Sequence, residues 1–148
     1  MAVTAVIAAS GLARGACVTS RSHTRGVGAA VAAPLGWRVG VDLVVMDRVG
    51  ARHADALLGE QERSVLEGYG KLGPALAWAL KEAAAKASGD PTRRFPLGLG
   101  IEMAAGGLIV RAGGMELAAR WEVFGELLCG WVWTEALRWV MPPSLRSG

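Results

Sequence analysis

Runs of apolar residues predict strands through the first third of the chain. Residues 37–46 are almost continuously apolar, which is typical of a strand that is buried on both faces or lies at a layer interface. Residues 1–9 are apolar and β-branched enough for another strand. A strand ending in Ser22-His23-Thr24, followed by a second one over residues 27–33, predicts a β-hairpin.

One long helix is predicted between Pro74 and Gly89. Proline suits a first helical turn, where a missing N–H costs nothing, and glycine suits the left-handed position just past a helix C-terminus. Almost all residues between these two are strong helix formers. Two shorter helices are expected before it, over residues 51–58 and 60–68, with Asp47 as a candidate cap of the first.

The last third of the chain predicts further strands. They are indicated at residues 98–103, 108–111 and 127–134. Residues 115–124 are compatible with a helix or a strand, and residues 135–141 with one or two helical turns. The expected fold is therefore α+β, a mostly antiparallel sheet packed against one long helix, in a single domain over residues 1–148.

Composition narrows the class of protein. Hydrophobic residues make up 52% of the 148 positions and charged residues 20%, which argues against a disordered chain. The net charge of +3 and the isoelectric point near 9.3 suit a polyanionic ligand or an acidic partner. No run of lysine and arginine alternates with aromatic residues, so a nucleic-acid surface is not expected.

The expected compartment is the cytoplasm. Cys17 and Cys129 are too few for a disulfide framework and lack metal-ligand spacing, so both are expected to be reduced thiols. The apolar start of the chain has no basic residue before it, which argues against a signal peptide. Residues 121–141 are interrupted by charged side chains, so we expect no membrane span.

Four polar residues have both a structural and a chemical explanation. Asp42 lies inside the longest apolar run, so its carboxylate must be ion-paired, hydrogen-bonded to backbone N–H groups, or bound to a cation. Glu82 and Lys86, four residues apart, share one helix face; this is the ordinary spacing of a surface ion pair, or the start of a rigid site. His23 in a hairpin bend can contact an anion or simply be solvated.

Three segments taken in order resemble a known family: Ser20-Arg21-Ser22-His23-Thr24, Gly40-Val41-Asp42-Leu43-Val44, and residues 78–86 with the pattern Trp-Ala-Leu-Lys-Glu-Ala-Ala-Ala-Lys. The 4′-phosphopantetheinyl transferase superfamily has Ser-x-Ser-His-Ser/Thr, Gly-Ile/Val-Asp and Trp-x-x-Lys-Glu-Ala-x-x-Lys. The resemblance covers roughly residues 17–89, and its third motif is the most specific.

This resemblance implies a transfer of the phosphopantetheine arm of coenzyme A to a serine of an acyl or peptidyl carrier protein, in fatty acid or polyketide biosynthesis. Adenosine 3′,5′-bisphosphate would leave. Asp42 and Glu82 would bind Mg²⁺, which offsets charge on the pyrophosphate. Glu82 would also act as the base, and Lys86 would neutralise a phosphate oxygen. Ser22 and His23 would contact the nucleotide phosphates, with Lys81 acting electrostatically.

The sequence departs from the family pattern at positions that bear on activity. The larger, surfactin-synthetase-activating type has a third metal carboxylate where this chain has Val44, and the small holo-acyl-carrier-protein synthase type has a glutamate where it has Val45. Arg21 replaces a usually apolar residue. The chain has about the length of one lobe of the two-lobed type, so a homo-oligomer, a trimer or a dimer, is expected to complete the coenzyme A cleft.

Two other functions remain open. A catalytically weak or inactive relative would bind carrier protein or coenzyme A as an interaction module, as Val44, Val45 and Arg21 suggest. The intact motif residues Lys81, Glu82 and Lys86 argue against it. A relative that shares only the fold would perform unrelated small-molecule chemistry, which no residue of the sequence identifies.

Overall fold

The structure is a computed structural model that describes residues 4–8, 17–89 and 98–135. Its strands are β1 (Thr4–Ala8), β2 (Cys17–Thr24), β3 (Val27–Pro34), β4 (Trp37–Val45), β5 (Leu99–Ala104), β6 (Gly107–Ala112), β7 (Met115–Phe124) and β8 (Leu127–Glu135). Its helices are α1 (Ala51–Leu57), α2 (Glu60–Glu67) and α3 (Gly73–Ser88), with short 3₁₀ turns η1 (Met46–Arg48) and η2 (Gly70–Leu72).

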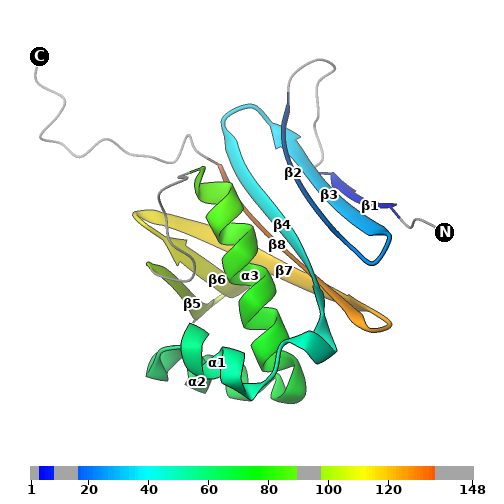
Figure 1. The fold of residues 1–148 in the computed structure, drawn as a ribbon. Coiled ribbons are helices and arrows are strands. Elements are labelled where there is room, and N and C mark those ends of the chain that lie inside the picture. The colour runs from blue at the N-terminus through cyan, green and yellow to red at the C-terminus, as the bar shows by residue number, and fades with distance from the viewer. Residues whose placement is uncertain (1–3, 9–16, 90–97, 136–148) are drawn as a thin grey trace, which may run out of the picture.

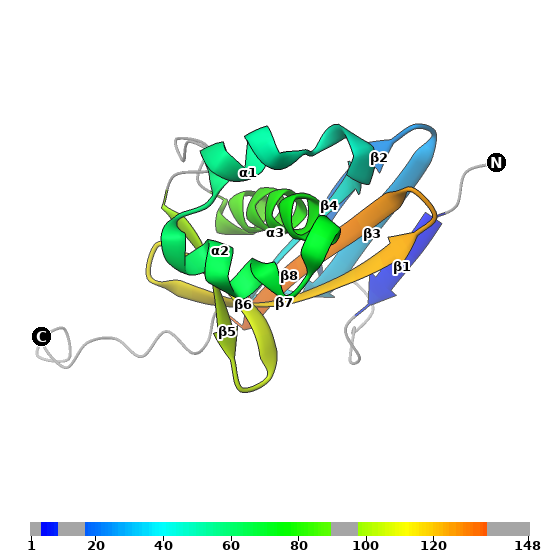
Figure 2. The same ribbon diagram turned by 90° about the horizontal axis from the view of Figure 1, so that it is seen from below.

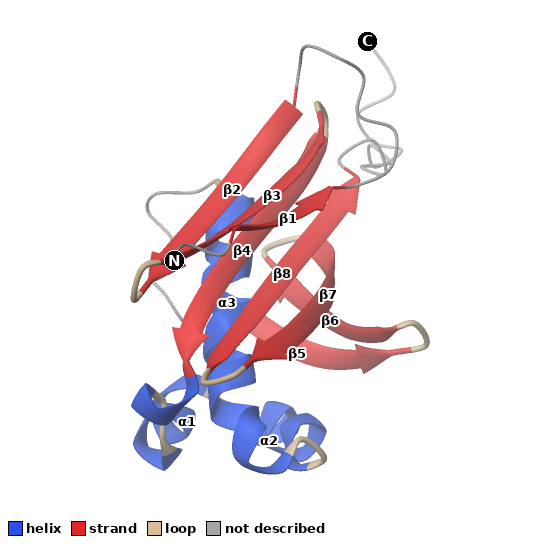
Figure 3. Ribbon diagram, turned by 90° about the vertical axis from the view of Figure 1, so that its right-hand side faces the viewer, coloured by secondary structure: helices blue, strands red, loops and turns tan. Residues whose placement is uncertain are grey.

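The strands form two sheets. A three-stranded sheet has the order β1-β3-β2, with β1 parallel to β3, and a five-stranded sheet has the wholly antiparallel order β4-β8-β7-β6-β5. Helix α3 crosses one face of the large sheet, and the small sheet packs beside β4 and β8 (Figures 1 and 3). Helices α1 and α2 flank α3 (Figure 2). This arrangement confirms the predicted α+β class.

Strand β4 lies between two hydrophobic cores, as its continuous apolar run predicts. Val39, Val41 and Leu43 pack with residues of β3 and β8 in the core beneath the small sheet. Val44 points to the other face and joins the larger core around α3. Side chains alternate between the faces of a strand, so the intervening positions 40 and 42 also face α3.

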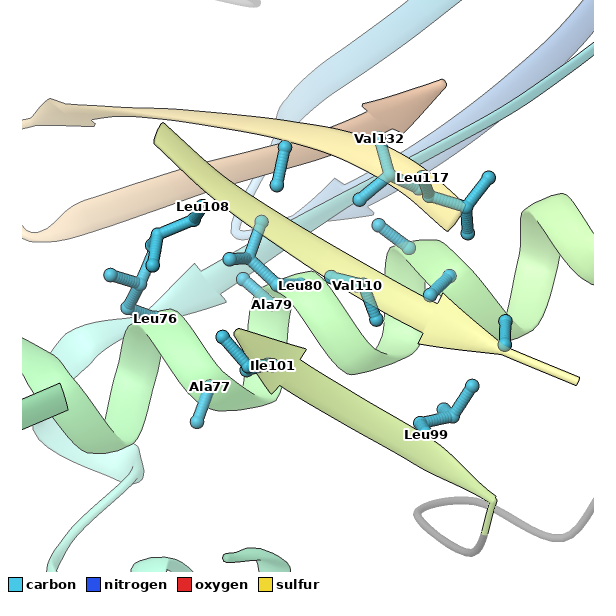
Figure 4. Close-up of a cluster of buried hydrophobic side chains, with 14 of the residues drawn as sticks. Leu76, Ala77, Ala79, Leu80, Leu99, Ile101, Leu108, Val110, Leu117 and Val132 are labelled. Carbon is cyan, nitrogen blue, oxygen red and sulfur yellow. The ribbon is translucent and has the colours of Figure 1, made fainter. Parts of the chain in front are cut away.

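The larger core lies between α3 and the large sheet. Leu76 and Leu80 of α3 are fully buried and belong to one cluster with Leu117 and Val132 of the sheet (Figure 4). The alanines of α3 allow an unusually close approach: a Cβ atom placed on Gly40 would lie only 1.8 Å from the carbonyl oxygen of Ala83. The small residues on both elements thus bring the helix backbone directly onto β4.

The caps of α3 agree with the sequence, whereas one other predicted cap does not. Pro74 lies in the first turn of α3, and Gly89 adopts the left-handed conformation at its C-terminus, with φ of 65°. The prediction that Asp47 caps α1 is wrong, because Asp47 lies in η1 and Gly50 is the N-cap. The imidazole Nδ1 of His53, at the third helical position, accepts a hydrogen bond from the Gly50 N–H at 3.2 Å, which is the reciprocal half of a capping box.

The strand predictions are largely confirmed. The ambiguous residues 115–124 form strand β7, and the predicted hairpin is β2–β3. The helical turns expected over residues 135–141 fall mostly outside the described residues. No helix in the described part of the chain is both long and apolar enough to cross a membrane.

Candidate active site

The seam between β2 and β4 is held by serine hydroxyls. Ser20 and Ser22 are two residues apart, so both side chains lie on the same face of β2. The hydroxyl of Ser20 accepts a hydrogen bond from the Val41 N–H, and that of Ser22 accepts one from the Leu43 N–H, both at 3.1 Å. These hydroxyls therefore occupy the free backbone edge of β4 and fix β2 beside Asp42.

Asp42 is buried and ion-paired, and an ion pair is one of the three alternatives predicted for its carboxylate. Its Oδ1 atom accepts a hydrogen bond from the Ser22 hydroxyl at 2.9 Å and lies 2.8 Å from the ammonium nitrogen of Lys86. The residue is 9% exposed. A buried carboxylate needs such compensation, and here it is provided by one group from β2 and one from α3.

Lys86 ties together the three elements of the site. Besides the Asp42 carboxylate, its Nζ donates to the carbonyl oxygen of Val41 at 2.9 Å and to that of Arg21 at 3.4 Å. An ammonium group has three protons, so all of them are in use. Lys86 can contact a ligand phosphate only by exchanging one of these partners.

Glu82 lies one helical turn before Lys86 and faces the same seam. Its carboxyl has a pKa raised above the usual value, mainly by partial burial, then by the negative charge of Asp42, while Lys86 acts in the opposite direction. The two carboxylates are therefore close enough to repel each other electrostatically. A divalent cation relieves this kind of repulsion, so the donor set suits Mg²⁺.

Within residues 4–8, 17–89 and 98–135, two carboxylates rather than three are available for such an ion. Val44 and Val45 are both buried, and Val44 belongs to the core around α3, so neither adds an oxygen ligand. No cluster of three or more His, Cys, Asp or Glu side chains suited to a metal occurs among the described residues. Water and ligand oxygens would have to complete the shell of any ion at Asp42 and Glu82.

The structure does not bring His23 to the carboxylates. Its neighbour Ser22 points inward to Asp42, so His23 lies on the outer, solvent-exposed face of β2. Arg21 shares that outer face and is exposed; only its carbonyl oxygen contacts Lys86.

Lys81 also lies away from the carboxylates. It is 2% exposed, its Nζ is 2.8 Å from Glu62 Oε1, and it donates a hydrogen bond to the Leu57 carbonyl oxygen. Glu62 in turn accepts hydrogen bonds from the Gly59 and Ile101 N–H groups, both at 2.9 Å. The motif lysine thus joins α1, α2, α3 and β5, which is a structural arrangement.

No role was predicted from the sequence for two polar residues: Glu62, which was not singled out, and Ser20, which was noted only as part of a motif. The alternation of Ser20 and Ser22 was a signal for two hydroxyls on one strand face. Glu62 stands three residues after Gly59, a spacing typical of a helix N-terminus, but nothing in the sequence pairs it with Lys81. Cys129, also buried beside the seam, has a pKa raised to about 11 by burial and by Asp42 and Glu122, so it remains a neutral thiol.

Two grooves flank the seam at opposite ends of α3. One, of about 360 Å³, lies at the C-terminal end and is lined by residues that include Trp37, Arg38 and Lys86. The other, of about 230 Å³, lies toward the N-terminal end and is lined by residues that include Val45, His53 and Trp78. Asp42 and Glu82 are thus located between two concave surfaces.

Comparisons with known proteins identify relatives. Residues 38–125 match the profile of the 4′-phosphopantetheinyl transferase superfamily. A holo-(acyl-carrier-protein) synthase from Bacillus anthracis, solved in complex with CoA (3′,5′-ADP), is 22% identical with a TM-score of 0.53, over 67% of this chain and 96% of its own. A holo-[acyl-carrier-protein] synthase from Neisseria meningitidis is 21% identical, with a TM-score of 0.53 over 65% and 95% of the two chains. A search of curated proteins gives no match.

These matches confirm the resemblance drawn from the motifs and the predicted fold. The matched residues 38–125 include Asp42, Glu82 and Lys86, whereas Ser22 and His23 precede them. At this level of identity the solved structures establish a shared fold and leave the residue roles to be argued from the site itself.

Proposed function

The chain belongs to the 4′-phosphopantetheinyl transferase superfamily, and from this premise we propose that it transfers the 4′-phosphopantetheine arm of coenzyme A to a serine of an acyl or peptidyl carrier protein. Adenosine 3′,5′-bisphosphate is the other product. The observation that carries the proposal is the meeting of Asp42, Glu82 and Lys86 at one seam, with the two carboxylates close enough for the charge of Asp42 to raise the pKa of Glu82.

Mg²⁺ is the proposed metal, held by Asp42 and Glu82. When bound, it would offset the negative charge on the pyrophosphate and on its leaving oxygen. The like-charge repulsion that raises the pKa of Glu82 supports a cation at this position.

Glu82 is the proposed general base. It takes the proton of the carrier serine while that hydroxyl oxygen forms a bond to the β-phosphorus of coenzyme A. The phosphorus–oxygen bond to the nucleotide breaks at the same centre, and the nucleotide phosphate keeps the electron pair. Partial burial favours this role, because a raised pKa makes the carboxylate a better proton acceptor.

Lys86 and Ser22 are proposed to orient the reacting groups. Lys86 would exchange its Asp42 contact for a phosphate oxygen, and Ser22 would keep the Asp42 carboxylate in place through its 2.9 Å hydrogen bond. Ser22 has a single hydroxyl proton, already donated to Asp42, so we propose it as a positioning group rather than a phosphate donor. The exposed face with His23 remains a proposed contact for phosphate.

A binding module without activity is the second candidate. Buried Val44 and Val45 favour it, because they leave two carboxylates for a metal among the residues that the structure describes. Such a module would bind coenzyme A or a carrier protein and release both unchanged.

We also propose a single domain over residues 1–148 and a cytoplasmic homo-oligomer, a dimer or trimer, that acts in fatty acid or polyketide biosynthesis. A single-lobe relative needs a second copy to provide the other wall of its coenzyme A cleft. Sedimentation analysis with and without coenzyme A tests this; an active monomer argues against it.

The transfer assay separates the two candidates. Purified protein is incubated with coenzyme A, Mg²⁺ and a panel of apo carrier proteins, and adenosine 3′,5′-bisphosphate is quantified by chromatography. Stoichiometric release that depends on a carrier protein supports the transferase. Binding of coenzyme A without release of adenosine 3′,5′-bisphosphate in the presence of any carrier protein supports the module and rejects the enzyme.

A further inference from the structure

The groove at the C-terminal end of α3 is lined by two cationic side chains, Arg38 and Lys86. The reaction proposed above gives a role to Lys86 and none to Arg38. It is lined by Thr19 of β2, Trp37 and Arg38 at the start of β4, and Lys86, Ala87 and Gly89 at the end of α3, among others. None of the described residues that line it is an Asp or Glu. A groove of about 360 Å³ is within the range of small-ligand sites.

Arg38 is the distinctive residue of this groove. It is exposed, and no ion pair or hydrogen bond joins its guanidinium to another residue in the described part of the chain. Its Nη1 atom lies 2.9 Å from the position that a Cβ atom on Gly89 would take. Gly89, with φ of 65°, therefore leaves the room in which the guanidinium lies against the end of α3.

The groove is continuous with the carboxylate seam through one side chain. Lys86 lines the groove and is also bonded to Asp42 at 2.8 Å. A ligand that places one phosphate at Lys86 can place a second anionic group at Arg38. The indole of Trp37, which is partly exposed between the core and the groove, provides an aromatic surface for a base.

We propose that Arg38 and Trp37 bind the 3′-phosphorylated nucleotide end of coenzyme A, with the guanidinium on the 3′-phosphate and the indole against the adenine. The proposal rests on the transferase function proposed above. Neither residue belongs to the three motifs. Arginine matches a phosphate with paired N–H donors, so this residue selects a nucleotide with phosphates at both the 3′ and 5′ positions.

A simpler explanation of Arg38 is that it stabilises the C-terminal end of α3, where a cation is favourable. The two explanations differ in their consequences. A helix-end cation affects the melting temperature and leaves ligand affinity unchanged. If Arg38 instead binds the 3′-phosphate, its removal lowers the affinity for the nucleotide that carries this phosphate. The affinity for the analogue without the 3′-phosphate is then unaffected.

The test is calorimetric titration of the full chain with adenosine 3′,5′-bisphosphate and with adenosine 5′-monophosphate, for the wild type, Arg38→Met and Trp37→Ala. Losing a charge-assisted contact is expected to weaken binding about tenfold or more. Arg38→Met should weaken only the bisphosphate, and Trp37→Ala should weaken both nucleotides. Arg52→Met, which removes an exposed arginine of α1, is the matched control and should change neither.

Two outcomes of the titration overturn the proposal: no binding of the bisphosphate to the wild type, or equal affinity of wild type and Arg38→Met for the bisphosphate. The transfer assay is independent of this titration. Bisphosphate binding that depends on Arg38, without transfer to any carrier, rejects the transferase and retains the nucleotide site. Transfer with an unchanged KM for coenzyme A in Arg38→Met retains the transferase and rejects the nucleotide site.

Discussion

Replacing Gly40 with alanine is expected to push α3 away from β4. The new Cβ atom would lie 1.8 Å from the Ala83 carbonyl oxygen and 2.7 Å from its carbonyl carbon. Both are backbone atoms, so no side-chain rotation relieves the overlap. Reaching an ordinary contact of 3.4 Å from 1.8 Å requires a displacement of about 1.6 Å.

This displacement bears on both stability and the site. Overpacking a core costs about 1–3 kcal/mol, and a backbone-on-backbone contact should reach about 3 kcal/mol or more. For a chain of this size that lowers the melting temperature by roughly 6–12 °C. Ala83 lies between Glu82 and Lys86, so the same shift would stretch the 2.8 Å contact between Lys86 and Asp42 beyond ion-pair distance.

Thermal and urea unfolding of Gly40→Ala measure the first effect, and Mn²⁺ titration measures the second. Gly100→Ala is the control, because Gly100 lies in strand β5 and no atom lies within 4 Å of its virtual Cβ position. The control should be unchanged or slightly more stable, because alanine reduces the entropy of the unfolded chain. Equal stability of the two variants would refute the close contact between β4 and α3.

Three further predictions concern the charged groups. Lys86→Met should abolish transfer yet bind Mn²⁺ more tightly, by about 2 kcal/mol or ~30-fold, because a positive charge about 4 Å from a divalent ion is removed. Lys71→Met is the control, and weaker Mn²⁺ binding by Lys86→Met would count against this prediction. Without divalent ions, Glu82→Gln should be more stable to urea than the wild type at pH 7 and equally stable below pH 4.5. The pKa of Glu82 is raised in the folded wild type, so the wild type loses stability as the pH rises through that pKa, whereas glutamine does not ionise. A more stable wild type at pH 7 would contradict this sign. Lys81→Met should lower the free energy of unfolding by about 3–5 kcal/mol, because it leaves the buried charge of Glu62 unpaired, and adding Glu62→Gln should restore much of this loss. Additive losses in the double variant would exclude the coupling between Lys81 and Glu62.

The sequence predicted the elements of the site better than the partners of its residues. The apolar run of β4 and the end residues Pro74 and Gly89 of α3 are local signals, and the structure has both elements where these signals indicate them. Asp42 inside the apolar run was expected to be ion-paired, hydrogen-bonded to backbone N–H groups or bound to a cation, and the structure shows an ion pair with Lys86. Burial and backbone preference act over short stretches of chain, so they are visible in the sequence.

Side-chain direction was harder to predict. Lys81 and Glu82 are neighbours in the motif, but successive helical residues differ by about 100° around the axis, so Lys81 turns to Glu62 while Glu82 faces the seam. His23 and Ser22 are separated in the same way by strand alternation. Glu62 was missed because its pairing with Lys81 depends on how α2 packs against α3, a tertiary contact without a local signature.

The most direct test of the account is the intact mass of an apo carrier protein after incubation with coenzyme A and Mg²⁺. Wild-type protein should add one phosphopantetheine group to the carrier, Asp42→Asn and Glu82→Gln should add almost none, and Glu102→Gln, which changes an exposed carboxylate paired with Arg111, should match the wild type. Full transfer by Asp42→Asn or Glu82→Gln would contradict the assigned site. No mass gain with any carrier at high protein concentration would contradict the transferase itself.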